Sequence, residues 1–159
     1  MEQEWRTLGG RQIAEIVGEV ETTLINEIAA GNEIKVCIGC DSQMHGAHCE
    51  FATAIVFIRK QRGGFIFVSK ETSKNYHGKI KQRMLDEVSR AIATAYQLCD
   101  LLDRYDVPME VHADINQSPN FESNVALKEA MGYILGMGFQ FKAKPDAFAS
   151  SSCANKVVQ

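Results

Sequence analysis

The 159-residue sequence is 45% hydrophobic and 23% charged with three prolines, a composition typical of a globular domain that excludes a largely disordered chain. It has no apolar run long enough for a transmembrane helix, no start resembling a signal peptide and an odd number of cysteines, five, so we expect a cytoplasmic protein with reduced thiols and no membrane partner. The formal net charge of -3 argues against nonspecific coating of nucleic acid.

The first third of the chain predicts one helix and then three strands. Apolar residues recur every three or four positions over residues 11–30, and Gly31 follows as a stop signal. We expect this helix to pack its apolar face on the sheet or on a partner copy. Runs rich in Val, Ile and Phe then predict strands at residues 33–40, 51–58 and 64–69. The links between them are short, so successive strands should be antiparallel.

The rest of the chain alternates helices with strands. Each helical crossover should add a strand parallel to the last, so the first, third, fourth and fifth strands are expected to run in the same direction. The predicted elements are a helix at residues 80–103, a strand at 109–115, a helix at 122–135, a strand at 139–143 and a helix at 145–158.

Acidic residues follow the strands that should be parallel. Asp41 ends the first, Glu71 the third and Asp114 the fourth, while Asp146 follows the fifth at the start of the last helix. The carboxyl ends of parallel strands lie at one edge of a sheet, so these acids can cluster there around Mg²⁺ or Mn²⁺. Alternatively, Asp41 and Asp114 could cap turns and Asp146 could cap a helix. Glu71 is the weakest candidate, because the third strand is expected at the sheet edge, roughly 10 Å from the first.

Four motifs carry a family resemblance. IGCDSQ, KIKQRMLDEVSRAIATA, VHADIN and KPDAFASSSCAN, in this order, resemble the ribonuclease H fold and, more closely, the YkuK group of ribonuclease H-like bacterial proteins. The resemblance implies an α/β fold with a mixed five-stranded sheet, three antiparallel strands then two parallel, flanked by helices and preceded by an extra N-terminal helix. The length of the chain predicts a single domain over residues 1–159, with a helical extension at 1–31 and the core at 32–159.

The resemblance also implies a catalytic site. Ribonuclease H enzymes use Asp, Glu, Asp and Asp to hold two metal ions during phosphodiester cleavage. By position, Asp41, Asp114 and Asp146 match the three aspartates, and the glutamate should come from the helix at 80–103. Glu87 lies about 60° from the centre of the apolar stripe of that helix and Asp86 about 160°, which favours Glu87.

The expected catalytic and metal-binding set is therefore Asp41, Glu87, Asp114 and Asp146, with two Mg²⁺ or Mn²⁺ ions. In ribonuclease H the glutamate typically follows an Arg-Met pair directly, whereas Leu85 and Asp86 follow Arg83-Met84 here. The helix register thus leaves open whether Glu87 or another acid is the fourth ligand.

A basic segment suggests the substrate. Residues 59–90 contain nine basic side chains and three acidic ones, and the loop within this segment combines charges with aromatic rings. Basic and aromatic residues together suit contacts to a nucleic acid backbone and to its bases. The predicted substrate-binding residues are Lys74, Tyr76, His77 and Lys79.

We therefore expect a nuclease that acts on RNA or an RNA/DNA hybrid. The alternative is a non-catalytic nucleic-acid-binding or protein-interaction module on the same fold, because no histidine precedes Asp146 and the net charge is negative. Cys37-x-x-Cys40 with His45 and His48 invites a zinc hypothesis, but residues three apart on a strand point to opposite faces. His112 inside the fourth strand is expected to be a structural histidine. The oligomeric state stays open.

Overall fold

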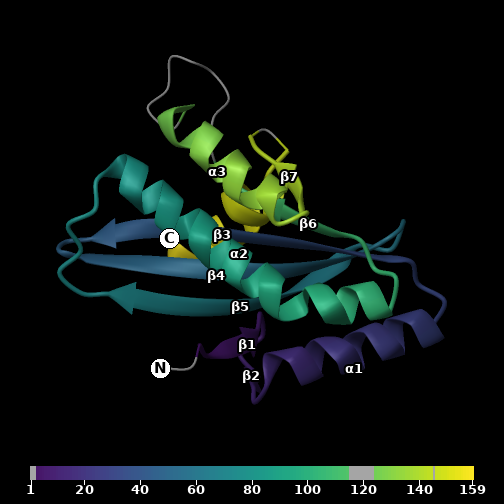
Figure 1. The fold of residues 1–159 in the computed structure, drawn as a ribbon. Helices are drawn as coiled ribbons and strands as arrows, with labels where there is room; N and C mark the ends of the chain where they lie inside the picture. Colours follow the sequence, from purple (N-terminus) through teal and green to yellow (C-terminus); the bar gives the residue numbers. More distant parts are fainter. Residues whose placement is uncertain (1–2, 115–123, 145) are drawn as a thin grey trace.

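The structure is a computed structural model that describes residues 3–114, 124–144 and 146–159. Its strands are β1 (Trp5–Thr7), β2 (Gln12–Ile13), β3 (Ile34–His45), β4 (His48–Arg59), β5 (Gly64–Ser73), β6 (Met109–His112) and β7 (Gln140–Lys142). They form one seven-stranded sheet in the order β2-β1-β5-β4-β3-β6-β7 (Figure 1). As expected, β3, β4 and β5 are antiparallel neighbours, and β6 and β7 run parallel to β3.

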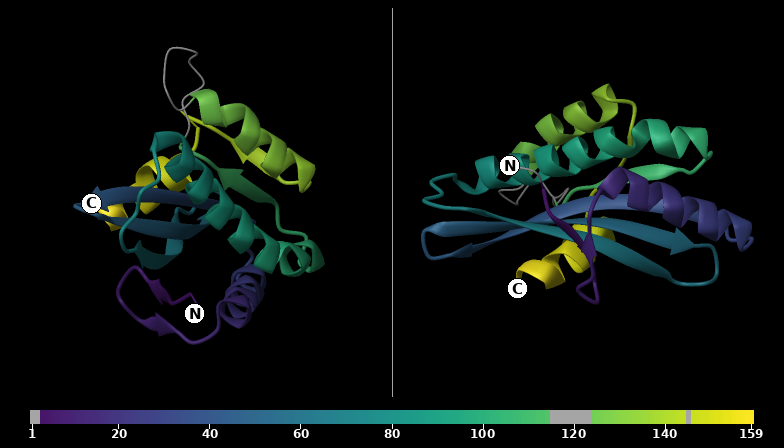
Figure 2. Two further views of the ribbon diagram at one scale, coloured as in Figure 1. Left: turned by 60° about the vertical axis from the view of Figure 1, so that its left-hand side comes forward. Right: turned by 90° about the horizontal axis from the view of Figure 1, so that it is seen from below.

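Helices cover both faces of this sheet. They are α1 (Ile16–Ala29), α2 (Ile80–Arg104), α3 (Asn124–Gly136), the π-helix η1 (Ala149–Ala154) and α4 (Asn155–Val158). Figure 2 shows α1, α2 and α3 on one face and the C-terminal η1 and α4 on the other. Within the described residues, none of the helices combines the length and the apolar character needed to cross a bilayer.

Strand β3 is buried on both faces, which explains its nearly continuous apolar sequence. Val36 and Ile38 face α2 and belong to the larger hydrophobic core. Cys37 faces the opposite side and belongs to a smaller core beneath η1 and α4. Successive side chains of a strand alternate between its faces, so the order of residues in β3 sets which helix layer each can reach.

Helix α1 packs on the sheet, as the sequence predicted. Val20 and Leu24 are fully buried in the larger core. Glu27 accepts two hydrogen bonds from the Arg59 guanidinium, at 2.8 Å from Nε and 2.7 Å from Nη2, which tie α1 to the end of β4. The helix begins at Ile16 rather than at residue 11, because Gln12 and Ile13 pair with β1 instead.

Two further expectations about the sheet are wrong. The sheet has seven strands rather than five, because β1 and β2 extend it. Strand β5 is not an edge strand, since Arg6 and Thr7 of β1 pair with it. Each extra strand is only two or three residues long and was too short to show an alternating pattern.

The strand and helix ends near the acids also differ from expectation. Asp41 does not end its strand: β3 continues to His45, and Asp41 pairs with Ala52 of β4. Strand β5 likewise continues past Glu71 to Ser73. The last helix begins as η1 at Ala149 rather than at residue 145. The hydroxyls of Ser150 and Ser151 both donate to the carbonyl of Ala147, a local bonding pattern that competes with a regular helix start. Residues 115–123, which include the predicted end of the fourth strand and start of the next helix, lie outside the described residues.

Candidate metal-binding carboxylate site

Asp41 and Asp114 lie at the same level of the sheet. Strand β6 pairs with β3 in parallel, and the last pair joins Gly39 to His112. Each aspartate follows its member of that pair by two residues. Beyond this pair β6 ends, so the edge of β3 beside Asp41 is no longer covered by a neighbouring strand of the described chain. The sheet thus opens where the two carboxyl groups lie.

Glu87 reaches the same place from α2. It is 6% exposed, and its Oε1 accepts a hydrogen bond of 2.7 Å from the Ser42 hydroxyl. Asp86, its neighbour, instead accepts hydrogen bonds from Tyr76 and Gln82 and is half-buried. Helical geometry correctly selected Glu87 as the acid that faces the sheet. We call Asp41, Glu87 and Asp114 the carboxylate cluster.

Asp41 is held by two neighbours. It is 6% exposed, Oδ1 accepts the backbone N–H of Ser42 at 2.9 Å, and Oδ2 accepts Nδ2 of Asn155 at 2.7 Å. Asn155 opens α4, on the face of the sheet opposite Glu87. Side chains from both helical layers therefore converge on β3 at Asp41 and Ser42.

Burial and like charges together raise the pKa values of Asp41 and Glu87 in the cluster. Burial raises the pKa of Glu87 well above its usual range, and the charge of Asp41 raises it further. Burial also raises the pKa of Asp41, against the hydrogen bonds from Asn155 and Ser42, and the charge of Asp114 adds to the rise. The charges of the carboxyl groups thus interact, and a cation between these groups would favour their ionised forms.

Asp114 has an oxygen without a hydrogen-bond partner. Its Oδ1 is buried and accepts no hydrogen bond from the described residues, although it forms an ion pair with Nζ of Lys144 at 3.0 Å. Buried carboxylate oxygens normally have partners. Three carboxyl groups with spare oxygen lone pairs match the all-oxygen ligand sets of Mg²⁺ and Mn²⁺. These residues therefore suit the metal ions that the sequence predicted.

Asp146 is placed differently from the other three predicted ligands. It lies in a bend after β7, its backbone N–H donates to the carbonyl of Ala143 at 2.8 Å, and its side chain is exposed. Within the described residues, no hydrogen bond or ion pair joins its side chain to the carboxylate cluster. Asn155 and Ser42 contact the cluster instead. Both stand inside the motifs KPDAFASSSCAN and IGCDSQ, but only their spatial approach reveals the contacts.

The comparison with protein families agrees with this arrangement of strands and helices. The family model of ribonuclease H-like proteins matches residues 15–159. The chain belongs to the ribonuclease H-like family. A comparison with curated proteins finds no match. The family match includes α1, so the region typical of ribonuclease H-like proteins begins within the segment that the sequence analysis set apart as an extension.

The predicted substrate-binding residues lie in the connection from β5 to α2 of this ribonuclease H-like fold. Lys74, His77 and Lys79 are exposed. Tyr76 is not: its hydroxyl donates to Asp86, and its ring meets Phe51 edge-on with centroids 5.8 Å apart. Burial, together with Asp86, holds the pKa of Tyr76 above its usual range. Its ring anchors this connection to the core rather than standing free for base stacking.

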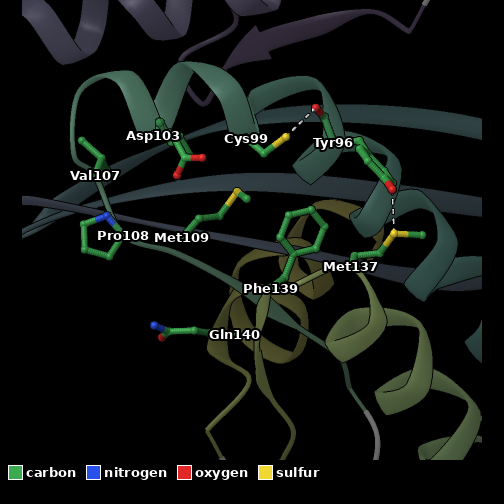
Figure 3. A pocket seen from close by; sticks show the side chains of 11 residues that line it. Tyr96, Cys99, Asp103, Val107, Pro108, Met109, Met137, Phe139 and Gln140 are labelled. Atoms are coloured by element: carbon green, nitrogen blue, oxygen red, sulfur yellow. Dashed lines mark hydrogen bonds between the residues drawn. The ribbon is translucent and has the colours of Figure 1, made fainter.

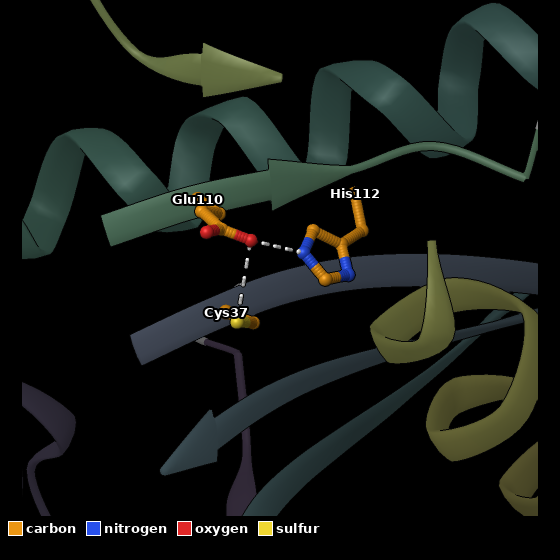
Figure 4. A group of neighbouring side chains, drawn as sticks. All are labelled: Cys37, Glu110 and His112. Carbon is orange, nitrogen blue, oxygen red and sulfur yellow. Dashed lines mark hydrogen bonds and ion pairs between the residues drawn. The ribbon is translucent and has the colours of Figure 1, made fainter. Parts of the chain in front are cut away.

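A second polar cluster, which we call the histidine cluster, consists of Cys37, Glu110 and His112 (Figure 4). The backbone N–H of Ala149 donates to His112 Nδ1 at 3.1 Å, so Nε2 carries the proton and lies 3.0 Å from Glu110 Oε1 as a donor. Neither ring nitrogen keeps a free lone pair for a metal. Burial raises the pKa of Cys37 to about 12, with the charge of Glu110 adding to the rise, so the thiol stays protonated.

The histidine cluster is therefore structural, the role expected for His112. Burial opposes ionisation of Glu110, but hydrogen bonds from His112 and from Lys35, whose Nζ lies 3.2 Å away, hold its pKa below the usual value. The bond from Ala149 ties η1 to β6. Gly39 permits this approach, because a Cβ there would lie 2.4 Å from the backbone nitrogen of Ser150.

A cavity of about 340 Å³ lies at the other end of the sheet (Figure 3). Pro108 and Met109, where β6 starts, and Phe139, just before β7, form one wall, and Tyr96 and Cys99 of α2 form another. Asp41 and Asp114, in contrast, lie at the carboxyl end of the parallel strands. The cavity is therefore separate from the carboxylate cluster.

Proposed function

We propose that this chain is a metal-dependent nuclease that hydrolyses phosphodiester bonds of RNA or of an RNA/DNA hybrid. One observation carries the proposal: Asp41 in β3, Glu87 in α2 and Asp114 just after β6 approach one another, and the charges of Asp41 and Asp114 add to the rise that burial causes in the pKa of Glu87. A protein has little structural reason to gather buried like charges, whereas a site for divalent cations requires them.

Asp41, Glu87 and Asp114 would hold the metal ions, with Asp146 as the proposed fourth ligand from the same end of the sheet. Two such ions can activate a water molecule and stabilise the leaving 3′ oxygen. Ser42 and Asn155 orient carboxylate oxygens of Glu87 and Asp41 through their hydrogen bonds. Such partners of ligands commonly tune metal affinity.

Exposed basic side chains beside this site would bind the substrate backbone. Lys74, His77 and Lys79 stand in the connection that leads into α2, the helix that carries Glu87. The charged groups of Lys74 and Lys79 and an N–H group of His77 suit phosphates, and the contacts would be independent of sequence. Tyr76 would act by holding this connection in place through Asp86 and Phe51.

A non-catalytic module is the second candidate, and one contact favours it. Lys144 pairs with Asp114 at 3.0 Å and supplies part of the countercharge that a metal would otherwise provide. A cluster neutralised from within could persist without ions. In that case the fold would bind nucleic acid or a protein partner without turnover.

Further details of the proposal rest on the sequence motifs. We propose membership of the YkuK group within the family, because the four motifs occur in order across the matched region. We also propose a cytoplasmic location, which agrees with the five cysteines being free thiols. Localisation of a tagged protein in the native cell would check the second point.

The test is cleavage of labelled single-stranded RNA, RNA/DNA hybrid, duplex DNA and branched DNA with Mg²⁺ or Mn²⁺. Asp114→Asn preserves size and removes the charge, and Asp100→Asn, an exposed residue of α2, is the matched control. We expect wild type and the control to cleave RNA or the hybrid, and Asp114→Asn to lose about 100-fold or more in rate. If folded wild type cleaves nothing and binds no Mn²⁺, the non-catalytic module becomes the better explanation.

A further inference from the structure

Arg83 differs from the other basic residues of α2, each of which pairs with an acid. Arg90 pairs with Glu71 at 2.8 Å and lies over the ring of Phe51. Lys81, Lys70 and Lys144 each pair with an acid as well, Glu129, Glu50 and Asp114 respectively. Arg83 makes no ion pair within the described chain, and its buried Nε has no hydrogen-bond partner. A buried donor without a partner is rare in folded proteins and calls for an explanation.

The position of Arg83 on α2 points toward the carboxylate cluster. It lies one helical turn before Glu87, so the two side chains share a face of the helix. Its charge also acts to lower the pKa of Asp41 and of Glu87, although burial outweighs it at both. The guanidinium is thus close enough to influence both carboxyl groups but is not bonded to either.

Helix electrostatics do not explain a cation here. Arg83 follows closely after the start of α2 at Ile80, and the first turn has no acidic residue. A positive charge near a helix N-terminus is unfavourable, whereas an anion there is stabilised. The start of α2 therefore combines exposed backbone donors, an unpaired guanidinium and adjacent metal ligands.

We propose that Arg83 binds a phosphate of the nucleic acid strand next to the bond that is cleaved. This inference rests on the proposed function. Guanidinium is a planar donor that binds two phosphate oxygens at once, and it keeps its charge when buried. A phosphate at this position would give Nε its missing acceptor while the neighbouring phosphodiester lies at the carboxylate cluster.

The test separates a phosphate contact from a structural role through two measurements. Arg83→Gln should lower kcat/KM about 10- to 100-fold, the scale of a hydrogen bond to a charged group, and Arg83→Lys should recover only part of this loss. Mn²⁺ affinity, measured by electron paramagnetic resonance, should stay equal or rise in Arg83→Gln, because a positive charge beside the ligands is removed. Lys81→Gln is the control, because Lys81 is an exposed residue of the same helix and pairs with Glu129.

Binding in the Asp114→Asn background tests the contact without cleavage. Adding Arg83→Gln should weaken RNA binding and reduce the slope of log Kd against log salt by about one phosphate contact. An unchanged Kd and slope would overturn the inference even if wild type is a nuclease. So would a parallel loss of Mn²⁺ affinity and cleavage, which indicates that Arg83 only positions Glu87. A wild type that binds RNA without cleaving it would contradict the proposed function alone.

Discussion

Two buried polar clusters share strands β3 and β6 but differ in how their charges are balanced. In the histidine cluster, Glu110 receives hydrogen bonds from His112 and Lys35, and Ala149 donates to the remaining ring nitrogen. In the carboxylate cluster, the charges of Asp41 and Asp114 act on Glu87, and Asp114 Oδ1 pairs with Lys144 but accepts no hydrogen bond from the described residues. The first cluster is balanced by hydrogen bonds within the protein, whereas in the second Lys144 supplies only part of the positive charge that three ionised carboxyl groups need.

The pKa directions express the same difference. Hydrogen bonds from His112 and Lys35 overcome burial and hold the pKa of Glu110 below its usual value. The pKa values of Asp41 and Glu87 are raised, chiefly by burial. The histidine cluster resembles a metal site by residue type, yet the carboxylate cluster is the better candidate for a metal site. The hydrogen bonds, rather than the residue types, separate structural from functional clusters here.

The largest expected effect is that of Glu87→Gln on cleavage. Removing this buried charge takes away a proposed metal ligand while Ser42 keeps a hydrogen-bond partner, so the rate with Mn²⁺ should fall about 100-fold or more with the fold intact. Asp86→Asn, one residue away and bonded to Tyr76, should stay within a few-fold of wild type. If Asp86→Asn abolishes cleavage and Glu87→Gln does not, the assignment of the helix register is wrong.

His112→Ala should affect stability instead of metal binding. It leaves the N–H of Ala149 without its acceptor and removes one hydrogen-bond donor to Glu110, so the free energy of unfolding should fall by about 2 kcal/mol in urea denaturation. His45→Ala, an exposed residue that pairs with Glu50 at 3.5 Å, should change it by less than about 0.5 kcal/mol. Weaker Mn²⁺ binding in His112→Ala with unchanged stability would reverse the roles of the two clusters.

Much of this comparison was predictable from the sequence. The apolar stripe of α2 identified Glu87 as the inward acid, because a 3.6-residue period fixes which side chains share a face. The crossover connections predicted that β3 and β6 are parallel, and hence that Asp41 and Asp114 lie at the same end of the parallel pair. The opposite orientations of Cys37 and Cys40 also follow from strand alternation.

The remaining features depend on contacts between distant parts of the chain. The hydrogen bond from Asn155 to Asp41 joins residues 114 positions apart and requires η1 to lie against Gly39. The end of β3 was placed too early because its apolar run stops near Asp41, while backbone pairing with β4 continues to His45. The alternation of side chains reports burial, whereas the length of a strand depends on its partner.

The smallest expected effect is the pH dependence of thermal stability without metal. Because the pKa of Glu87 is raised in the folded protein, folding takes up a proton at pH values above the ordinary glutamate pKa of 4.5. The resulting stabilisation is present at low pH and is lost as pH rises through the folded pKa. The Glu87→Gln variant has no carboxyl group to ionise at this position, so its stability does not change with pH in this way. In EDTA, the Tm of Glu87→Gln minus the Tm of wild type should therefore increase as pH rises.

Taking this difference between two variants removes the contributions that they share. His112, whose pKa burial lowers, and Glu27 and Glu110, whose pKa values are lowered, titrate equally in both proteins. Added Mn²⁺ should reverse the order at neutral pH, because it binds the ionised cluster of wild type and stabilises that fold by mass action. If the difference in Tm stays constant with pH, or does not change when Mn²⁺ is added, the charge of Glu87 is balanced by groups of the protein, as the charge of Glu110 is.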